Sequence, residues 1–325
     1  MDCLILMTTY NGEKYIQQQV DSIIKQSFLN WKLIIRDDGS SDTTVDLLQK
    51  YCKQDQRIEL LANNTGKHGA YLNFFTLIEY AHTLKEYDYY FFADQDDIWL
   101  PNKLEDMIAF SEKRKSSVPR LVYGDMQVID CQSKVVYESI NKIMGIGNIS
   151  GLSQFFTHGF LWGCDSMINQ ALFKAVPVFP LYDPHIDIIS HDNYYGKFAK
   201  VLGEALYLDE PVIQHRRHGD NETGSYNMKL DPVKVFKRAF LQFDNLAKTH
   251  ARVYNQTLLT IREMKKNGVE TGEINKIKKA IENGGITGAI EMKTMKVARS
   301  QKARTAGIYI VMITGAYKKY IYKDI

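Results

Sequence analysis

The stretch Tyr89-Tyr90-Phe91-Phe92-Ala93-Asp94-Gln95-Asp96-Asp97 sets five aromatic or apolar residues directly before a loop with three carboxylates. The lack of polar–apolar alternation over residues 89–93 is typical of a strand buried on both faces of a parallel sheet. Where that strand ends, the carboxylates of Asp94, Asp96 and Asp97 repel one another. A hard divalent cation relieves such repulsion, since Mg²⁺ and Mn²⁺ both prefer carboxylate oxygen. We therefore predict a metal site at the end of a central strand, with a solvated acidic turn as the alternative.

Two earlier segments repeat the plan of an apolar run that ends in a polar loop. Residues 3–7 lead into Thr8-Thr9-Tyr10-Asn11-Gly12, and residues 31–35 lead into Arg36-Asp37-Asp38-Gly39-Ser40-Ser41-Asp42. A third strand is predicted over residues 58–62, and helical spacing occupies residues 15–26, 43–52, 70–83 and 101–110. Alternating strands and helices predict an α/β fold with a mostly parallel sheet. Ligands bind beyond the carboxyl ends of such strands, where the three polar loops lie.

The pattern loosens after residue 120. Short strands are predicted at residues 121–123 and 127–129, a loop at 140–153 and an extended segment at 173–184. A long helix without proline is predicted over residues 233–266, and Gly284-Gly285 interrupts the helical pattern again. We therefore expect a catalytic domain over residues 1–228, divided near residue 120, and a mainly helical region over residues 229–325.

The composition limits the class of protein. The chain has 325 residues, 45% hydrophobic and 24% charged, which is typical of a globular protein. Four scattered cysteines favour neither a disulfide framework nor a structural zinc site and fit a reducing, cytoplasmic location. The N-terminus lacks the basic region of a signal peptide, and no apolar run reaches the roughly 20 residues of a membrane span.

Charge is divided unevenly along the chain. Residues 229–325 carry 20 Lys and Arg against 8 Asp and Glu, a net charge of +12, although the whole chain carries only +3. A basic region with the apolar stretch 308–316 fits a peripheral contact with the inner face of an anionic membrane. A solvated lysine-rich helix and a homodimer contact are the alternatives. A nucleic-acid protein would not explain the carboxylates of the first half.

The first two loops also carry groups that suit a nucleotide. A carboxylate in Asp37-Asp38-Gly39 can accept a hydrogen bond from a pyrimidine N3–H or from a ribose hydroxyl, and Gly39 permits close approach of a ligand. The ring of Tyr10 can stack on a base. Helix capping by Ser41 or Asp42 and an ordinary Asn-Gly turn are the alternatives.

The three loops, in this order, resemble glycosyltransferase family 2, whose members have the Rossmann-like GT-A fold. The Asp94-Gln95-Asp96-Asp97-Ile98-Trp99 form is similar to the rhamnosyltransferase-like branch, and the resemblance covers about residues 3–224. It implies that Thr9, Tyr10, Asn11, Asp37, Asp38, Asp94 and Gln95 bind the nucleotide-sugar donor. It also implies that Asp94 and Asp96 bind the metal, with Asp96 the direct ligand.

Two later segments extend the resemblance. Ser190-His191-Asp192-Asn193 resembles the acidic motif in which a carboxylate is the general base, and this implies that role for Asp192. Capping of a helix by Asp192 is the alternative, and Asp187 is the rival base. His215-Arg216-Arg217-His218-Gly219-Asp220-Asn221 resembles the branch's basic motif. Arg216 and Arg217 offer forked donors for phosphate, and His218 is a candidate ligand of the metal or the diphosphate; an exposed basic loop is the alternative.

The acceptor side of the pocket is implied by Gly163-Cys164-Asp165-Ser166-Met167. We expect five residues to line this pocket: Trp99, Trp162, Gly163, Cys164 and His191. Burial in the hydrophobic core is the alternative for either tryptophan.

The resemblance implies an inverting, metal-dependent transfer of a sugar to a glycan or lipid-linked acceptor in cell-surface polysaccharide synthesis, with Mg²⁺ or Mn²⁺ as cofactor. L-Rhamnose from dTDP-rhamnose is the preferred donor, and UDP-linked hexoses are the alternative. A nucleotidyltransferase would carry a glycine-rich loop near the first strand, which residues 8–15 lack. A nucleotide- or glycan-binding module without activity is the non-enzymatic alternative.

Overall fold

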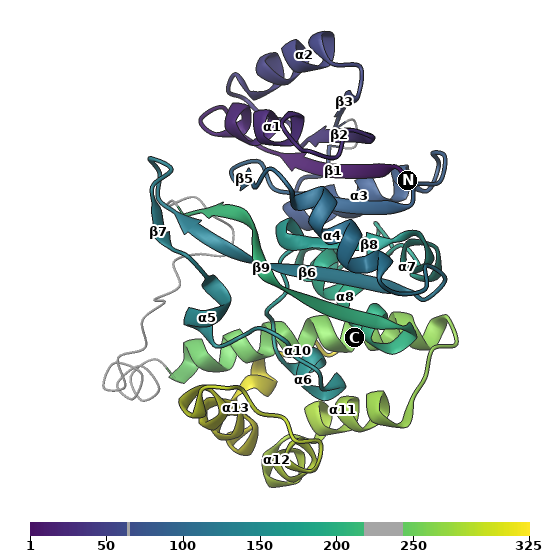
Figure 1. Ribbon diagram of the computed structural model, residues 1–325. Coiled ribbons are helices and arrows are strands. Elements are labelled where there is room, and N and C mark those ends of the chain that lie inside the picture. The colour runs from purple at the N-terminus through teal and green to yellow at the C-terminus, as the bar shows by residue number, and fades with distance from the viewer. Residues whose placement is uncertain (64–65, 218–242) are drawn as a thin grey trace.

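One mixed sheet organises the protein. The computed structural model describes residues 1–63, 66–217 and 243–325, and the strands in these ranges form a single nine-stranded sheet. The strand order is β3-β2-β1-β4-β8-β6-β9-β5, with β7 paired to β6 (Figure 1). The strands are β1 (Cys3–Thr9), β2 (Trp31–Asp37), β3 (Ile58–Ala62), β4 (Tyr89–Ala93), β5 (Ile98–Trp99), β6 (Arg120–Ile129), β7 (Val135–Tyr137), β8 (Ser166–Asn169) and β9 (Glu204–Arg216).

The first half of the sheet is parallel, as predicted. β1 lies between β2 and β4, and its register places Thr9 opposite Asp37 and Met7 opposite Ala93. All five residues of β4 are buried, which confirms a central strand covered on both faces. Because the three strands run in the same direction, their polar loops leave the sheet at one edge.

The second half of the sheet is mixed. β8 runs antiparallel to both β4 and β6, whereas β9 runs parallel to β6. β5 follows the acidic loop directly and pairs antiparallel with the end of β9, where Ile98 lies opposite Gln214. This pairing brings the acidic loop next to a segment more than a hundred positions later in the chain.

Helices flank the sheet and extend beyond it. The four helices predicted in the first 112 residues are confirmed, with ends moved by a few residues. The helices are α1 (Ile16–Ile24), α2 (Thr44–Gln54), α3 (Ala70–Ala81), α4 (Lys103–Glu112), α5 (Ile140–Met144), α6 (Leu152–Thr157), α7 (Gln170–Ala175), α8 (His191–Leu202), α10 (Phe243–Lys266), α11 (Gly272–Asn283), α12 (Gly285–Thr294) and α13 (Lys302–Thr314). Short 3-10 helices cover Gly163–Asp165, Ile186–Ile188 and Ala316–Tyr320.

The predicted loop over residues 140–153 was wrong in part, because it contains α5 and the start of α6. The Ser139 hydroxyl accepts a hydrogen bond from the Lys142 N–H and caps α5, and Gly145 ends it with a left-handed φ of 62°. The extended segment predicted at 173–184 was likewise wrong at its start, which lies in α7. Its cap is Asn169, whose side chain accepts from the Leu172 N–H. The two short strands predicted within residues 121–129 are one strand, β6.

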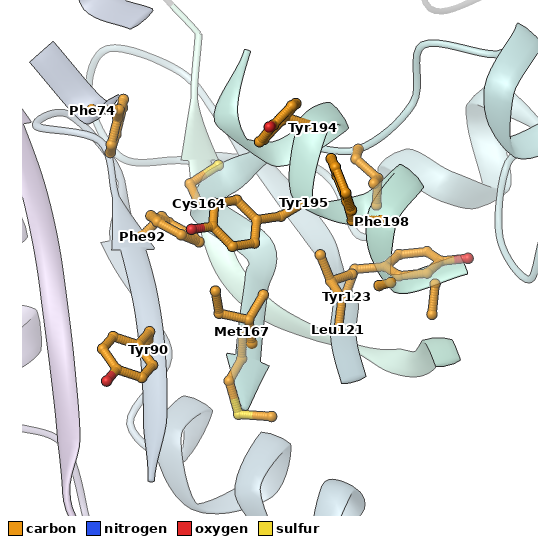
Figure 2. Packing of buried hydrophobic residues seen from close by; sticks show 14 of the residues in the cluster. Phe74, Tyr90, Phe92, Leu121, Tyr123, Cys164, Met167, Tyr194, Tyr195 and Phe198 are labelled. Atoms are coloured by element: carbon orange, nitrogen blue, oxygen red, sulfur yellow. The ribbon is translucent and has the colours of Figure 1, made fainter. Parts of the chain in front are cut away.

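Aromatic packing fixes α8 against the sheet. Tyr194, Tyr195 and Phe198 of α8 are fully buried, and they pack over β4, β8 and β6, which contribute Phe92, Met167 and Tyr123 (Figure 2). The ring centroids of Phe92 and Tyr195 lie 6.2 Å apart. This packing places the first turn of α8, and therefore Asp192, close to the end of β4.

The C-terminal helices lie at the opposite end of the molecule from α1 and α2 (Figure 1). α10 packs against α6 and α8, and its Thr257 Oγ1 donates to the Phe156 carbonyl of α6 (2.5 Å). Arg262 of α10 pairs with Asp183 in the segment between α7 and α8 (2.5 Å). The predicted break at Gly284-Gly285 separates α11 from α12. The predicted domain division at residue 228 lies outside the described residues and stays a prediction. No helix in the described part of the chain is long and apolar enough to cross a bilayer.

Candidate active site

Gln95 joins the first polar loop to the acidic loop. Its Oε1 accepts from the Tyr10 N–H (2.8 Å), and its Nε2 donates to the Tyr10 carbonyl (2.9 Å). A Cβ atom on Gly12 would lie 2.4 Å from Gln95 Oε1, so only glycine leaves room for this amide. Both ends of the Gln95 side chain are therefore engaged in the loop itself, and a contact with the donor stays a prediction. The Tyr10 side chain is 55% exposed and its ring is available for stacking.

Asn11 joins the first loop to the second. It adopts a left-handed φ of 47°, its N–H donates to Ser40 Oγ (2.8 Å), and its Oδ1 accepts from the Ser41 N–H (2.8 Å). The Gly12 N–H donates to Thr44 Oγ1 (2.8 Å) at the start of α2. These bonds give the backbone of the two loops one shared conformation.

Asp37 organises the second loop from within. Its Oδ1 accepts from the N–H groups of Gly39 (3.0 Å) and Ser40 (2.7 Å). Its Oδ2 accepts from the hydroxyls of Thr9 (2.9 Å) and Ser40 (2.6 Å). Asp37 and Thr9 are both buried, so the structure favours a positioning role for them over direct donor contact.

Asp38 lies next to the start of α3 and is as buried as Asp37. Its Oδ1 accepts from Asn63 Nδ2 (2.9 Å) and its Oδ2 accepts from the Gly69 N–H (2.8 Å). Arg36 lies 3.6 Å from Oδ1. Each oxygen retains acceptor capacity, because a carboxylate oxygen can take two hydrogen bonds. The predicted contact between Asp38 and a base remains compatible with this geometry.

The acidic loop contains carboxylates with opposite shifts of pKa. Burial and the neighbouring charges of Asp97 and Asp96 raise the pKa of Asp94 to about 8. Burial also opposes ionisation of Asp97, but the charge and hydrogen bond of His215 outweigh it and lower that pKa. Asp94 and Asp96 are only partly buried, whereas Asp97 is fully buried. The loop therefore has two carboxylates at its accessible side and one turned into the protein.

Asp97 and Arg216 hold the acidic loop against the end of β9. Asp97 Oδ1 accepts from His215 Nδ1 (2.9 Å) and from the Arg216 N–H (3.0 Å). Arg216 Nε donates to the Asp96 carbonyl (2.9 Å). The rest of the fully buried guanidinium donates to Gln18 Oε1 (2.6 Å), Ser133 Oγ (2.9 Å) and the Asp130 carbonyl (3.2 Å).

Arg216 therefore contacts protein groups where the sequence predicted phosphate contacts, and the structure favours a positioning role for it. Arg217 continues the chain beside β6, where its N–H donates to the Ile129 carbonyl (2.9 Å), and its side chain is partly exposed. His218 lies outside the described residues. The phosphate contacts of Arg217 and the metal role of His218 stay predictions.

Asp97, Cys164 and His215 form a three-donor group, with one ligand atom from each within 4.8 Å of the others. Burial raises the pKa of the Cys164 thiol well above its usual range, which disfavours the thiolate that a metal needs. Asp97 and His215 already bond to each other. Burial alone would lower the pKa of His215, but the charge and hydrogen bond of Asp97 raise it to about 9. We therefore assign this group to holding the loop, and the predicted metal role of Asp94 and Asp96 stays a prediction.

Gly163 and His191 lie in contact beside the acidic loop. A Cβ atom on Gly163 would lie 2.3 Å from His191 Nε2. The His191 ring stacks on Phe74 at 3.9 Å and lies 4.6 Å from Phe92, and burial lowers its pKa to about 4. Neither ring nitrogen has a hydrogen-bond partner among the described residues. His191 is therefore a neutral, buried ring that shapes the floor of the site.

The two predicted tryptophans differ in exposure. Trp99 is 2% exposed, and Lys103 Nζ lies 3.6 Å from the centre of its ring. The structure therefore favours the core role for Trp99. Trp162 is partly buried and retains exposed surface next to Gly163.

Asp192 lies in the first turn of α8, next to His191, whose ring packs 4.6 Å from that of Phe92 in β4. Ser190 occupies the N-cap position, so Asp192 does not cap the helix. Asp192 Oδ1 accepts from the Asn193 N–H (2.5 Å) and Nδ2 (3.0 Å), whereas Oδ2 accepts no hydrogen bond from any described residue. Burial is the main cause of the raised pKa of Asp94, and the charge of Asp192 adds a small part to it.

Buried charges next to the site were not predicted. Lys103 is 1% exposed, its Nζ donates to the Cys164 carbonyl (2.5 Å), and burial lowers its pKa to about 8. Burial raises the pKa of Asp165 well above its usual range, and the charge of Lys103 opposes that rise. Lys103 lies on the same helix face as Leu104, Met107 and Ile108. A lysine within the apolar stripe of a helix is the sequence pattern that could have predicted this burial.

Residues 4–176, more than half of the chain, match the family described as "Glycosyl transferase family 2". The chain belongs to glycosyl transferase family 2. The matched region begins in β1 and ends after α7, so it includes all three polar loops. The predicted transferase class is confirmed.

This glycosyltransferase is similar to named bacterial relatives. It is 28% identical over 225 residues to "dTDP-rhamnosyl transferase RfbG" of Shigella flexneri, covering 67% of this chain and 74% of the relative. It is 35% identical over 152 residues to "UDP-Glc:alpha-D-GlcNAc-diphosphoundecaprenol beta-1,3-glucosyltransferase WfgD" of Escherichia coli, covering 44% of this chain and 56% of the relative. The first similarity supports the rhamnosyltransferase-like branch.

Solved structures confirm the GT-A fold of this glycosyltransferase. "S. aureus TarS 1-349 in complex with UDP-GlcNAc" has a TM-score of 0.55 and 16% identity, over 99% of this chain and 93% of that one. The match to the longer TarS structure, also with a TM-score of 0.55, spans 55% of that chain. At this identity the likeness concerns the fold alone.

Proposed function

We propose that this glycosyltransferase moves a sugar, with inversion, from a nucleoside diphosphate donor to a glycan or lipid-linked acceptor of cell-surface polysaccharide. The preferred donor is dTDP-L-rhamnose. One observation carries the proposal: hydrogen bonds join the three loops at one sheet edge, and Asp192 follows His191, whose ring packs 4.6 Å from that of Phe92 near the end of β4. The residues that bind the sugar donor and the general base would thus lie on either side of one reaction site.

The donor nucleotide is proposed to lie over the first two loops. The exposed ring of Tyr10 offers a stacking surface for a base. Asp38 offers acceptor capacity next to Gly69, whose backbone N–H it already binds. In this arrangement the backbone around Tyr10 and Asp38 is kept in one conformation by the hydrogen bonds of four neighbours: Thr9, Asn11, Asp37 and Gln95.

The acidic loop fits a divalent cation. Burial first, and then the charges of Asp97 and Asp96, raise the pKa of Asp94, and a bound cation would offset the repulsion among these carboxylates. Asp94 and Asp96 supply the hard oxygen ligands that Mg²⁺ and Mn²⁺ prefer. When bound, such an ion neutralises charge on a departing diphosphate.

Asp192 is proposed as the general base. Its carboxylate takes the proton of the acceptor hydroxyl while that oxygen forms a bond to the anomeric carbon. The bond from the anomeric carbon to the phosphate oxygen breaks in the same step, and its electron pair leaves with the nucleoside diphosphate. One displacement inverts the anomeric configuration, and no covalent enzyme intermediate is required.

Thermal shifts with UDP, dTDP, GDP and CMP, each with Mn²⁺ and with EDTA, test the donor site. We expect stabilisation by dTDP that EDTA removes, since a ligand that binds only the folded state raises its stability. Stabilisation by UDP alone would favour the UDP-hexose alternative, which the similarity to WfgD supports. The absence of a shift with every nucleotide would contradict the proposed donor site.

The acceptor is tested separately by transfer from the nucleotide sugar selected in the thermal shifts. A metal-dependent product with an inverted anomeric centre, seen by NMR, is the expected result. Retention of configuration would contradict the single displacement. A cytoplasmic location and a homodimer stay predictions.

A further inference from the structure

Large apolar side chains reach the surface together on α12 and α13. Ile286 and Ile290 lie one turn apart on α12 and are 70% and 58% exposed. Ile310 and Ile313 lie one turn apart on α13 and are 47% and 49% exposed. The two helices pack against each other at one end of the molecule (Figure 1). Grouped apolar exposure of this kind marks an interaction surface.

The outer side of α13 is apolar between its two ends. The inner side buries Ile308, Val311 and Met312 against the core. The exposed positions on the other side begin with Lys302 and end with Thr314, and those between them are uncharged and recur at helical spacing: Ala303, Ala306, Ile310 and Ile313. A helix that is apolar on both sides, with only one side covered by protein, lacks a partner for the other.

The segment that contains α12 and α13 is strongly basic. Residues 285–320 contain seven Lys and Arg and a single acidic residue, Glu291. Lys293 near the end of α12 and Lys302 at the start of α13 are both exposed. A second copy docked by the same face would bring two strongly positive surfaces together, which electrostatic repulsion disfavours. A surface of opposite charge with an apolar interior fits better.

We propose that the outer face of α12 and α13 docks on an anionic lipid bilayer. Ile286, Ile290, Ile310 and Ile313 enter the interface, and Lys293 and Lys302 approach the phosphates of the headgroups. The proposal goes beyond the transfer chemistry, because this face lies outside the candidate active site and its docking requires no donor. It narrows the predicted membrane contact from the whole basic C-terminal region to the outer face of α12 and α13.

Co-sedimentation of the full chain with vesicles tests this docking. We compare phosphatidylcholine vesicles with and without phosphatidylglycerol, at low and high salt. The protein is expected to bind the anionic vesicles and to dissociate at high salt. Ile310→Asp combined with Ile313→Asp should weaken binding about tenfold or more, because two apolar side chains leave the interface.

Charge reversal provides a second test. Lys293→Glu with Lys302→Glu should weaken binding about fivefold per lysine and reduce its salt dependence. An acidic residue at position 302 suits the start of α13, so a loss would not report unfolding. Thermal melting checks the fold of every variant.

Matched controls carry the same changes at the other end of the molecule. The control for the isoleucine variant is Leu29→Asp, at a residue that is 69% exposed. The control for the lysine variant is Lys50→Glu with Lys53→Glu, at two exposed positions of α2. Both controls should bind vesicles as the parent does. Equal binding to neutral and anionic vesicles, no binding, or normal binding by the isoleucine variants would overturn the proposal.

Two further measurements separate the alternatives. If light scattering without lipid shows a dimer that the isoleucine variants lose, the face joins two copies and the lipid proposal is wrong. Nucleotide thermal shifts on the same variants should equal those of the parent. Failure of vesicle binding with intact nucleotide shifts would remove the docking proposal and leave the proposed function standing.

Discussion

Asp192 and Asp187 are the two candidate bases, and their surroundings separate them. Asp192 lies at the start of α8, and its charge contributes to the raised pKa of Asp94. Asp187 lies in the preceding 3-10 helix, where its Oδ1 is only 3.0 Å from the position that a Cβ atom on Gly69 would take. Asp187 therefore faces the loop around Asp38, on the proposed nucleotide side.

Asp192→Asn should lose transfer activity by about 10²–10⁴-fold, because the amide cannot take the proton of the acceptor hydroxyl. The kcat for transfer and the nucleotide affinity are measured separately, and the affinity should be unchanged. Asp187→Asn is the control and should retain the base function. A normal kcat in Asp192→Asn, or a larger loss in Asp187→Asn, would exchange the roles.

At single residues, the sequence predicted which loops meet better than where each side chain lies. Tyr10 and Asp38 lie at the sheet edge as expected, because polar residues after buried strands must lie there, and their contacts with a donor stay predictions. The Arg216-Arg217 pair gave a signal for anions, but only the fold shows that Arg216 is fully buried. Which of two adjacent side chains points inward depends on the strand that carries them.

At the scale of elements, the end of β9 supports the acidic loop. Arg216→Lys should lower the free energy of unfolding by about 3 kcal/mol, because a lysine cannot replace the forked donors to several buried acceptors. Urea unfolding measures this loss. Arg217→Lys, next along the chain and partly exposed, should change stability by less than about 0.5 kcal/mol.

The same pair of variants also tests the phosphate prediction. With a positioning role, the folded fraction of Arg216→Lys binds nucleotide with near-parental affinity. If Arg216→Lys keeps its stability in urea but loses nucleotide binding, the predicted contact of Arg216 with the diphosphate would be supported instead.

Prediction of elements succeeded where the pattern was continuous. β1 and β4 read as uninterrupted apolar runs because both faces of the sheet are covered there. β9 was missed because Asp209, Glu210 and Pro211 interrupt it at an exposed stretch. β6 read as two strands because its pairing with β9 shifts register beside Asp125. Irregular pairing leaves no simple period in the sequence.

For the whole molecule, three buried histidines link stability to pH. Burial lowers the pKa of His158 to about 3 and the pKa values of His191 and His250 to about 4. His158 Nε2 lies 3.2 Å from the Ala298 carbonyl, so one of these rings joins the sheet-bearing half to the C-terminal helices.

Stability should fall as the pH falls below about 6.5, where the histidines of the unfolded chain take up protons that the folded chain excludes. The loss approaches about 1.4 kcal/mol per pH unit for each histidine, and continues down to the lowered pKa values. Urea unfolding at a series of pH values measures the slope. His158→Gln should reduce that slope by one histidine's share, and an unchanged slope would show that His158 does not contribute.

The pairing of β5 with β9 has a consequence for synthesis of the chain. Residues 94–99 leave the ribosome long before residues 213–216, which hold them in place. At about 5–20 residues per second, the acidic loop waits on the order of ten seconds for this partner. During that interval β4 ends in carboxylates with no β9 beside them, and Trp99 lacks the strand with which it pairs. A nascent chain halted before residue 204 would therefore present an unfinished acidic loop to chaperones and proteases.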